Sequence, residues 1–334
     1  MFCDARHYKI CYTACRDMRS LLKATLTLIG TIIGAGIFVL PEAFAAVGIV
    51  PASLIFWTMT AVVLATHLMM VDIELASKKP IRLAGAVRRW LGEPAFTFAA
   101  LTYPCHLIGA SVVYLVLGAS FLTMLLTPLG IPPAPFILQT AFWLGGVLVL
   151  VGGLRLLAKV EAWATWLLLV ALSLAIGWAW QQNGITSAPS HFALSLSLFG
   201  VCLFSLGGIP GMGEVVEIAG RERRRAQLAT IIGTLVAALV SWLFALTMAG
   251  TSLLSSSIWF STLMAGAGFL AVATSYIVVT QDLRATLMFD LNLHTREALA
   301  LAAGIPLVVT YMMAPSVFAT VSIVGTVFGG ADGV

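Results

Sequence analysis

Charge is the scarcest feature of this chain. Its 334 residues are 10% charged and 60% hydrophobic, whereas ordinary soluble domains carry about 25% charged residues. So little charge cannot cover a surface exposed to water, which excludes an ordinary soluble domain. The composition predicts an all-α membrane protein with several spans in the lipid bilayer. The formal net charge of +4 is small, and no nucleic-acid partner is expected.

Cysteine is also scarce, with five residues. Three of them, Cys3, Cys11 and Cys15, lie near His7, but their spacing matches no paired Cys-x-x-Cys pattern. Neither a disulfide framework nor a zinc site is predicted. The sequence also lacks clustered catalytic groups such as His-x-x-x-His, so an enzyme is not expected and no organic cofactor is predicted.

Long apolar runs are abundant, and a membrane-spanning helix needs about 20 such residues. On this rule the sequence predicts ten spans with short connections, preceded by a disordered lead-in over residues 1–20. The spans fall near residues 24–47, 50–72, 95–126, 135–155, 158–180, 192–219, 226–250, 258–288, 297–314 and 316–334.

The positive charges give the orientation independently of hydropathy. All 18 Lys and Arg residues fall on one side of the predicted spans, for example in the run 221–225, and the opposite connections contain none. Positive residues stay on the cytoplasmic side. Both termini are therefore predicted to be cytoplasmic.

Two spans contain residues that disfavour a continuous helix. The first has Gly34-Ala35-Gly36 at its centre, and the sixth has Gly207, Gly208, Pro210 and Gly211. Small residues also serve close helix packing, which is the alternative explanation. The breaks are five spans apart, so the two halves, 21–182 and 190–334, enter the membrane from opposite sides. Paired interrupted helices in inverted halves are typical of secondary transporters.

The residues of the first break also carry a family resemblance. Gly30–Pro41, Gly-Thr-Ile-Ile-Gly-Ala-Gly-Ile-Phe-Val-Leu-Pro, resembles the first helix of amino-acid permeases of the amino acid–polyamine–organocation superfamily, most of all the aromatic and hydroxy amino-acid branch. Weaker agreement comes from Gly207–Glu217, Ala273–Tyr276 and Gly325–Gly333. The resemblance covers about residues 20–334. It implies the leucine-transporter fold: five plus five inverted helices, with helices 1 and 6 unwound at the midplane. Many relatives have further helices, whereas this sequence stops within or just after the tenth.

An amino acid is a zwitterion, and a broken helix can bind both of its charged ends. The N–H groups of Gly34, Ala35 and Gly36 are expected to hold the carboxylate at a positive helix end. The carbonyls of Ile32, Phe204 and Ser205 are expected to hold the ammonium. Further predicted pocket residues are small and leave space for a bulky apolar or aromatic side chain, although small residues equally serve packing. These are Gly109, Ala110, Ser111, Gly207 and Gly208.

The sequence leaves open whether the coupling ion is H⁺ or Na⁺. The resemblance implies a sodium site formed by the carbonyls of Gly30, Ile33 and Ala271 with the hydroxyls of Thr274 and Ser275. The alternative is that these two hydroxyls bond back to their own helix.

Proton coupling needs a titratable group within the membrane, where such groups are costly. Glu214, three residues past Gly211, and His106 in the third span are the candidates. For Glu214 the alternative is a solvated helix end, and His106 and His67 are each expected more often to be structural.

The predicted function is a secondary transporter of a neutral, aromatic or bulky apolar amino acid in a bacterial-type inner membrane, working by alternating access. Its partners would be the amino acid and the lipid bilayer. The alternative is a shortened permease that binds an amino acid without transporting it, as a sensor or an inactive remnant.

Overall fold

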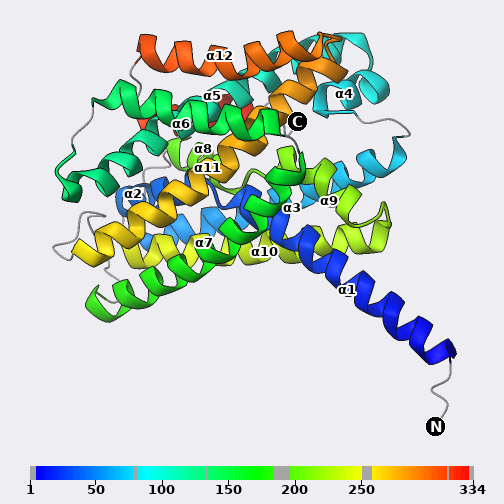
Figure 1. Ribbon diagram of the computed structural model, residues 1–334, viewed down its shortest axis with the longest axis horizontal. Coiled ribbons are helices and arrows are strands. Elements are labelled where there is room, and N and C mark those ends of the chain that lie inside the picture. Colours follow the sequence, from blue (N-terminus) through cyan, green and yellow to red (C-terminus); the bar gives the residue numbers. More distant parts are fainter. Residues whose placement is uncertain are drawn as a thin grey trace.

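The computed structural model describes residues 5–77, 81–131, 134–152, 154–183, 196–249, 258–313 and 316–330. Side chains are described from Asp17 onward, apart from those of residues 154–162, 182–183 and 196. Every regular element is a helix in these segments (Figure 1). The cysteines near His7 lie outside the described side chains.

The first part of the chain forms seven α-helices and one 3₁₀ turn. They are α1 (Ala5–Ile32), α2 (Gly36–Val47), α3 (Ile49–Ala76), α4 (Leu83–Leu91), α5 (Glu93–Leu126), η1 (Thr127–Leu129), α6 (Pro135–Gly152) and α7 (Leu154–Asn183). Helix α1 already begins at Ala5, so residues 5–20 are helical, where the sequence predicts a disordered lead-in. The short α4, whose last turn contains Arg88 and Arg89, is not among the predicted elements.

The second part of the chain has a similar run of helices. They are α8 (Leu196–Leu206), η2 (Ile209–Gly211), α9 (Met212–Ile218), α10 (Arg223–Met248), α11 (Ile258–Phe289), α12 (Thr295–Met313), α13 (Val317–Ile323) and the π-helical turn η3 (Val324–Gly329).

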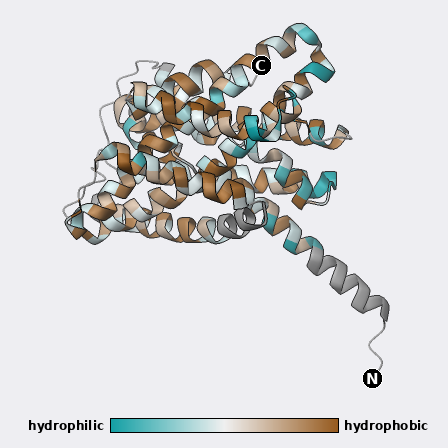
Figure 2. Cartoon of the chain, turned by 45° about the horizontal axis from the view of Figure 1, so that its top comes forward, coloured by the Kyte–Doolittle hydropathy of each residue, from teal (hydrophilic) through white to brown (hydrophobic). Residues whose placement is uncertain are grey.

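Eight of the described helical stretches are long and apolar enough to cross a membrane. The number rises to nine if the bent pair formed by α1 and α2 is counted as one span. A shorter apolar helix, Val317–Gly329, occupies the place of the predicted tenth span. Figure 2 shows hydrophobic residues along most of the helices, with hydrophilic stretches gathered mainly at helix ends. These long apolar helices make the chain an integral, multi-pass membrane protein.

The last helix is packed closely against the bundle. A methyl group at Gly325 would overlap the backbone of Gly200 in α8, and a methyl group at Gly200 would overlap the backbone at Ser322. Only residues without a Cβ allow two helix backbones to approach this closely. The helix at the end of the described chain is therefore seated directly on α8, the element that leads into the second break.

Candidate substrate site at two helix interruptions

The first interruption separates α1 from α2. Helix α1 ends at Ile32, helix α2 begins at Gly36, and the axes of the pair are bent by 55°. Glycine disfavours a helix interior by about 1 kcal/mol relative to alanine, which weakens the helix at this point. Among the described residues, no side chain caps the start of α2. Since the first N–H groups of a helix have no partner within it, they are available to a ligand.

Three other helices meet the first interruption. A methyl group at Gly34 would lie 2.6 Å from Ser275 Oγ on α11 and 3.3 Å from the Tyr114 hydroxyl oxygen on α5. A methyl group at Gly36 would overlap Ser205, near the end of α8. The glycines therefore let α5, α8 and α11 come up against the exposed backbone.

Several buried hydroxyl groups around this interruption lack a hydrogen-bond partner among the described residues. Ser275 Oγ and Ser205 Oγ are two of them, and Thr165 Oγ1, which lies against Gly30, is a third. Ser275 Oγ nevertheless lies close enough to the Tyr114 hydroxyl to interact with it. A buried polar atom without a partner costs about 1–3 kcal/mol. Such groups call for an explanation, and a polar ligand bound at the break would supply their partners.

The second interruption lies between α8 and α9, where Gly207 and Gly208 are not helical and η2 follows. Gly208 N–H donates to His67 Nε2 at 3.1 Å, and His67 Nδ1 lies 3.1 Å from Thr234 Oγ1 on α10. Because Nε2 accepts, the proton of the neutral ring sits on Nδ1 and is donated to Thr234. A fully buried histidine on α3 therefore satisfies one backbone N–H group of this break.

The backbone groups predicted to bind substrate are partly engaged with one another. Gly34 N–H donates to the Ile32 carbonyl at 2.8 Å, and Gly207 N–H to the Phe204 carbonyl at 3.4 Å. The uncapped start of α2, at Ala35 and Gly36, remains the available donor set.

The other predicted pocket residues differ in position. Ser111 is fully buried, and its hydroxyl has no hydrogen-bond partner among the described residues. A methyl group at Gly109 would lie 2.5 Å from Val324 of η3, so this glycine serves the packing of the last helix. His106 lies beside Tyr103, with ring centroids 6.5 Å apart, and beside Gly329. Neither Gly109 nor His106 adjoins the first interruption through these contacts.

The residues of the predicted sodium site are only partly arranged as ligands. Thr274 Oγ1 donates to its own helix, at 3.0 Å from the Leu270 carbonyl and 3.1 Å from that of Ala271. This is the alternative that the sequence left open, and it also engages the Ala271 carbonyl. Ser275 Oγ and Thr165 Oγ1 are neutral oxygen atoms without a partner in the described chain. Such oxygens suit a hard cation, but Thr165 is not among the predicted ligands.

Sequence reasoning missed two residues at the first break, Tyr114 and Thr165. It expected His67 to be structural, but it did not place His67 at the second break. The Tyr114 ring lies 6.3 Å from that of Phe204, centroid to centroid, and both rings are buried. A tyrosine in the middle of a predicted apolar span was the available signal for Tyr114. No signal in the sequence places Thr165 against Gly30, because that contact depends on how α7 packs on α1.

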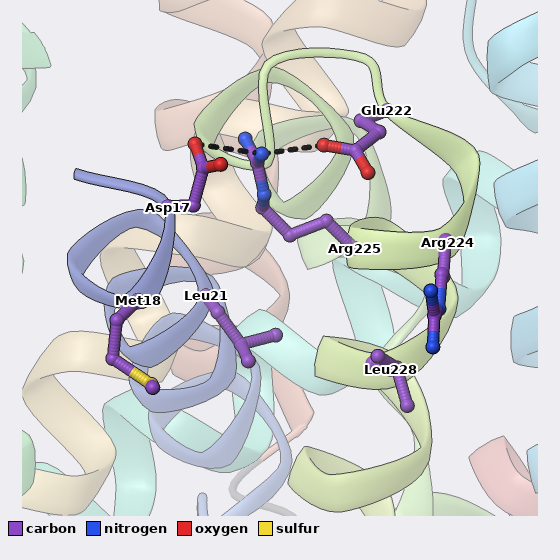
Figure 3. A pocket seen from close by; sticks show the side chains of 7 residues that line it. All are labelled: Asp17, Met18, Leu21, Glu222, Arg224, Arg225 and Leu228. Atoms are coloured by element: carbon purple, nitrogen blue, oxygen red, sulfur yellow. Dashed lines mark ion pairs between the residues drawn. The ribbon is translucent and has the colours of Figure 1, made fainter. Parts of the chain in front are cut away.

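A surface pocket lies elsewhere, where the side chains of α1 face the start of α10 (Figure 3). Arg225 is at its centre and forms ion pairs with Asp17, at 2.8 Å, and with Glu222. Its guanidinium group is thus already occupied by two carboxylates. The pocket joins α1 to the loop before α10 and is distinct from the interruptions.

Comparison with known families accounts for this architecture. The sequence model of the tryptophan/tyrosine permease family matches residues 17–255. The chain belongs to the tryptophan/tyrosine permease family. Its fold is similar to that of MhsT in a crystal structure "in complex with L-phenylalanine", with a TM-score of 0.67 and 15% sequence identity. That match covers 93% of this chain and 87% of MhsT. The permease is therefore a transporter by family, and its all-helical fold is similar to that of MhsT.

Proposed function

We propose that this permease is a secondary active transporter of a neutral amino acid with an aromatic or bulky apolar side chain. The observation that carries the proposal is the uncapped start of α2, which faces the unpartnered hydroxyls of Ser205 and Ser275. The N–H groups at Ala35 and Gly36 would bind the substrate carboxylate at a positive helix end. The hydroxyls and nearby carbonyls would accept hydrogen bonds from the ammonium group.

The aromatic preference is supported by Tyr114 and Phe204, whose buried rings stand beside this break. Aromatic rings favour one another in tilted or edge-to-face arrangements, at about 0.5–1.5 kcal/mol per pair beyond burial. The family match and the phenylalanine bound by MhsT point to the same substrate class.

The transport cycle would be alternating access between two groups of helices. The spans formed by α1–α2, α3, α8–α9 and α10 would move against the remaining helices, in a ten-helix arrangement of two inverted halves with both breaks at the bilayer midplane. We place the protein in a bacterial-type inner membrane with both termini cytoplasmic, on the distribution of Lys and Arg.

The coupling ion would be a proton. The Thr274 hydroxyl is engaged within its own helix, which disfavours the predicted sodium site. Glu214, in the first turn of α9, is half-buried beside charged groups. His106 is a weaker candidate because it lies beside the last helix.

Uptake into proteoliposomes tests the proposal. Purified protein would be reconstituted, and radiolabelled L-tryptophan, L-tyrosine and L-phenylalanine would be offered with an inward proton gradient, with L-lysine as the charged control. Each combination would be repeated with and without sodium. A carrier accumulates label until the gradient collapses. Label that saturates at the number of protein molecules would instead identify a binding protein that does not transport.

A further inference from the structure

A buried group of charges lies beside the start of α9, just past the second helix interruption. At its centre is Arg82, in the connection between α3 and α4. Its Nε lies 3.1 Å from Asp282 Oδ1 on α11, and its side chain is 20% exposed against 2% for Asp282. Tyr103 on α5 donates its hydroxyl proton to Asp282 Oδ2 at 2.5 Å. On this side Arg82 is paired with Asp282 on α11, and Asp282 is in turn bonded to Tyr103 on α5.

The other side of the guanidinium group faces α3 and α9. A methyl group at Gly213 would lie 2.6 Å from Arg82 Nη1 and 3.4 Å from Glu74 Oε1. Gly213 thus leaves the space in which the guanidinium of Arg82 and the carboxyl group of Glu74 come together. Glu214 follows directly in α9 and also acts electrostatically on Arg82. The guanidinium therefore stands between two groups of helices that alternating access would separate.

Carboxyl groups outnumber the cations that can compensate them here. The charged and titratable groups that face Glu74 and Arg82 come from every neighbouring element. They are Glu214 and Glu217 on α9, Arg221 after α9, Asp282 on α11, Asp290 after α11, Tyr103 and His106 on α5, and Arg88 on α4. Most of these have partners of their own. Arg221 donates to the backbone carbonyls of Glu74 and Ser77, both at 2.8 Å, and Glu217 is exposed.

Asp290 and Asp282 are the compensated carboxylates. Asp290 accepts the backbone N–H of Gly85 at 2.8 Å and that of Arg82 at 3.3 Å. Burial nevertheless raises the pKa of Asp290 above its ordinary value, with these two bonds opposing the shift. Burial acts to lower the pKa of Arg82, but Asp282 and the other neighbouring anions raise it overall, so the guanidinium stays charged.

Glu74 is a buried carboxyl group without such bonds among the described residues, whereas Glu214 on α9 is only half-buried. Glu74 is 6% exposed, and its Oε1 has no hydrogen-bond partner among the described residues. An ionised carboxylate in this position would be strongly penalised by loss of hydration, while a neutral carboxylic acid would not. Arg82 is already engaged with Asp282. The arrangement therefore fits Glu74 in its protonated form.

We propose that Glu74 is the proton-binding site of this permease and that its protonation state controls whether Arg82 holds the two groups of helices together. The step is transfer of one proton from hydronium to a carboxylate oxygen of Glu74, and no other covalent bond changes. When Glu74 is ionised, it attracts Arg82. Because Arg82 is also paired with Asp282, α3 and α9 are then held to α11. Protonated Glu74 releases Arg82 to Asp282 and lets the two groups of helices separate. The inference rests on the proposed transport function.

The experiment compares two activities of the same proteoliposomes. Gradient-driven accumulation requires proton coupling, whereas exchange of labelled for unlabelled L-tryptophan requires only binding and conformational change. For Glu74→Gln we expect exchange within about twofold of wild type and accumulation lowered about tenfold, a typical coupling effect. A pH-sensitive dye inside the vesicles would show correspondingly little proton entry with substrate. Glu74→Asp keeps a titratable group and should retain measurable proton entry.

Two further variants separate proton binding from general damage. Glu217→Gln removes an exposed carboxylate on α9 and should leave both activities unchanged. Gly213→Ala alters no charge but displaces the Arg82 guanidinium, and it should weaken coupling as Glu74→Gln does.

Three results would overturn the assignment. The first is unchanged accumulation and proton entry in Glu74→Gln. The second is loss of exchange together with accumulation in that variant, which would place Glu74 in the conformational cycle itself. The third is loss of coupling in Asp290→Asn but not in Glu74→Gln. A wild-type protein that neither accumulates nor exchanges any of the three amino acids would instead refute the proposed function.

Discussion

The two helix interruptions differ in how their polar groups are satisfied. At the first, the start of α2 has no side-chain cap in the described chain, and the neighbouring hydroxyls of Ser205 and Ser275 have no partner. At the second, the Gly208 N–H is bonded to His67, which is in turn bonded to Thr234. The first interruption bends the chain by 55°, whereas α8 and α9 still pass together as one span, Ser197–Ile218.

This difference assigns separate roles to two similar glycine-rich sequences. At the second break the Gly208 N–H has a partner within the protein, so we expect this position to contribute mainly to stability. A break surrounded by unpartnered polar groups gains stability when a polar ligand enters. Changes at the first break should therefore act on binding, and changes at the second should act on stability.

The largest effect is expected from Gly34→Leu. The added side chain would collide with Ser275 and approach Tyr114, filling the space at the first break. Overpacking of this kind costs about 1–3 kcal/mol, which lowers affinity by up to about a hundredfold. A scintillation proximity assay of L-tryptophan binding would measure this loss of affinity. Gly145→Leu is the matched control, because a methyl group there meets nothing within 4 Å. Unchanged binding in Gly34→Leu would contradict the backbone site.

His67→Ala tests the second break. It leaves the buried Gly208 N–H without an acceptor, at a cost of about 1–3 kcal/mol of stability. Thermal unfolding in detergent should therefore begin at a lower temperature, while the affinity for L-tryptophan changes much less. His67→Gln places an amide oxygen near the same position and should restore most of the loss. If His67→Ala lowered affinity more than stability, the second break would share in binding.

Ser275→Ala is a smaller test at the first break. Within the described protein the hydroxyl interacts only weakly, with the Tyr114 hydroxyl, so its removal should change stability by no more than about 1 kcal/mol. Loss of one hydrogen bond to the substrate should lower affinity about tenfold. Thermal unfolding and binding curves of the same variant would show a loss of affinity with little loss of stability. This is the opposite of the result expected for His67→Ala. A drop in stability without a drop in affinity would remove the contrast between the two breaks.

Thr274→Val should have the smallest effect. Its hydroxyl bonds back to Leu270 and Ala271, so it is engaged within α11 rather than facing the break. We expect the affinity for L-tryptophan and its response to sodium to change by less than about twofold. Binding curves with sodium or choline as the salt cation would measure this. A clear loss of sodium dependence would reinstate the predicted sodium site.

Sequence reasoning succeeded where the signal is local. Apolar runs of the right length predicted the long helices, and glycine with proline predicted where two of them are interrupted. It failed for groups whose role depends on a neighbour from another helix. His67 was expected to be structural, but its bond to Gly208 was not foreseen, and neither was the contact between Gly109 and Val324. Single-sequence periodicity contains no information about which helix faces which.

The amino-acid sequence by itself determined that the chain spans a membrane, which helices break and which family the first break resembles. These properties follow from hydrophobic length and backbone propensity, and both are set within a few turns of chain. Only the tertiary structure decided that a histidine bonds the Gly208 N–H at one break, whereas the helix start at the other break has no side-chain cap in the described chain. It also placed Arg82 between Asp282 and Glu74. Such pairings are fixed by the packing of helices far apart in sequence, because a buried polar group takes its partner from whatever side chain the fold brings within reach.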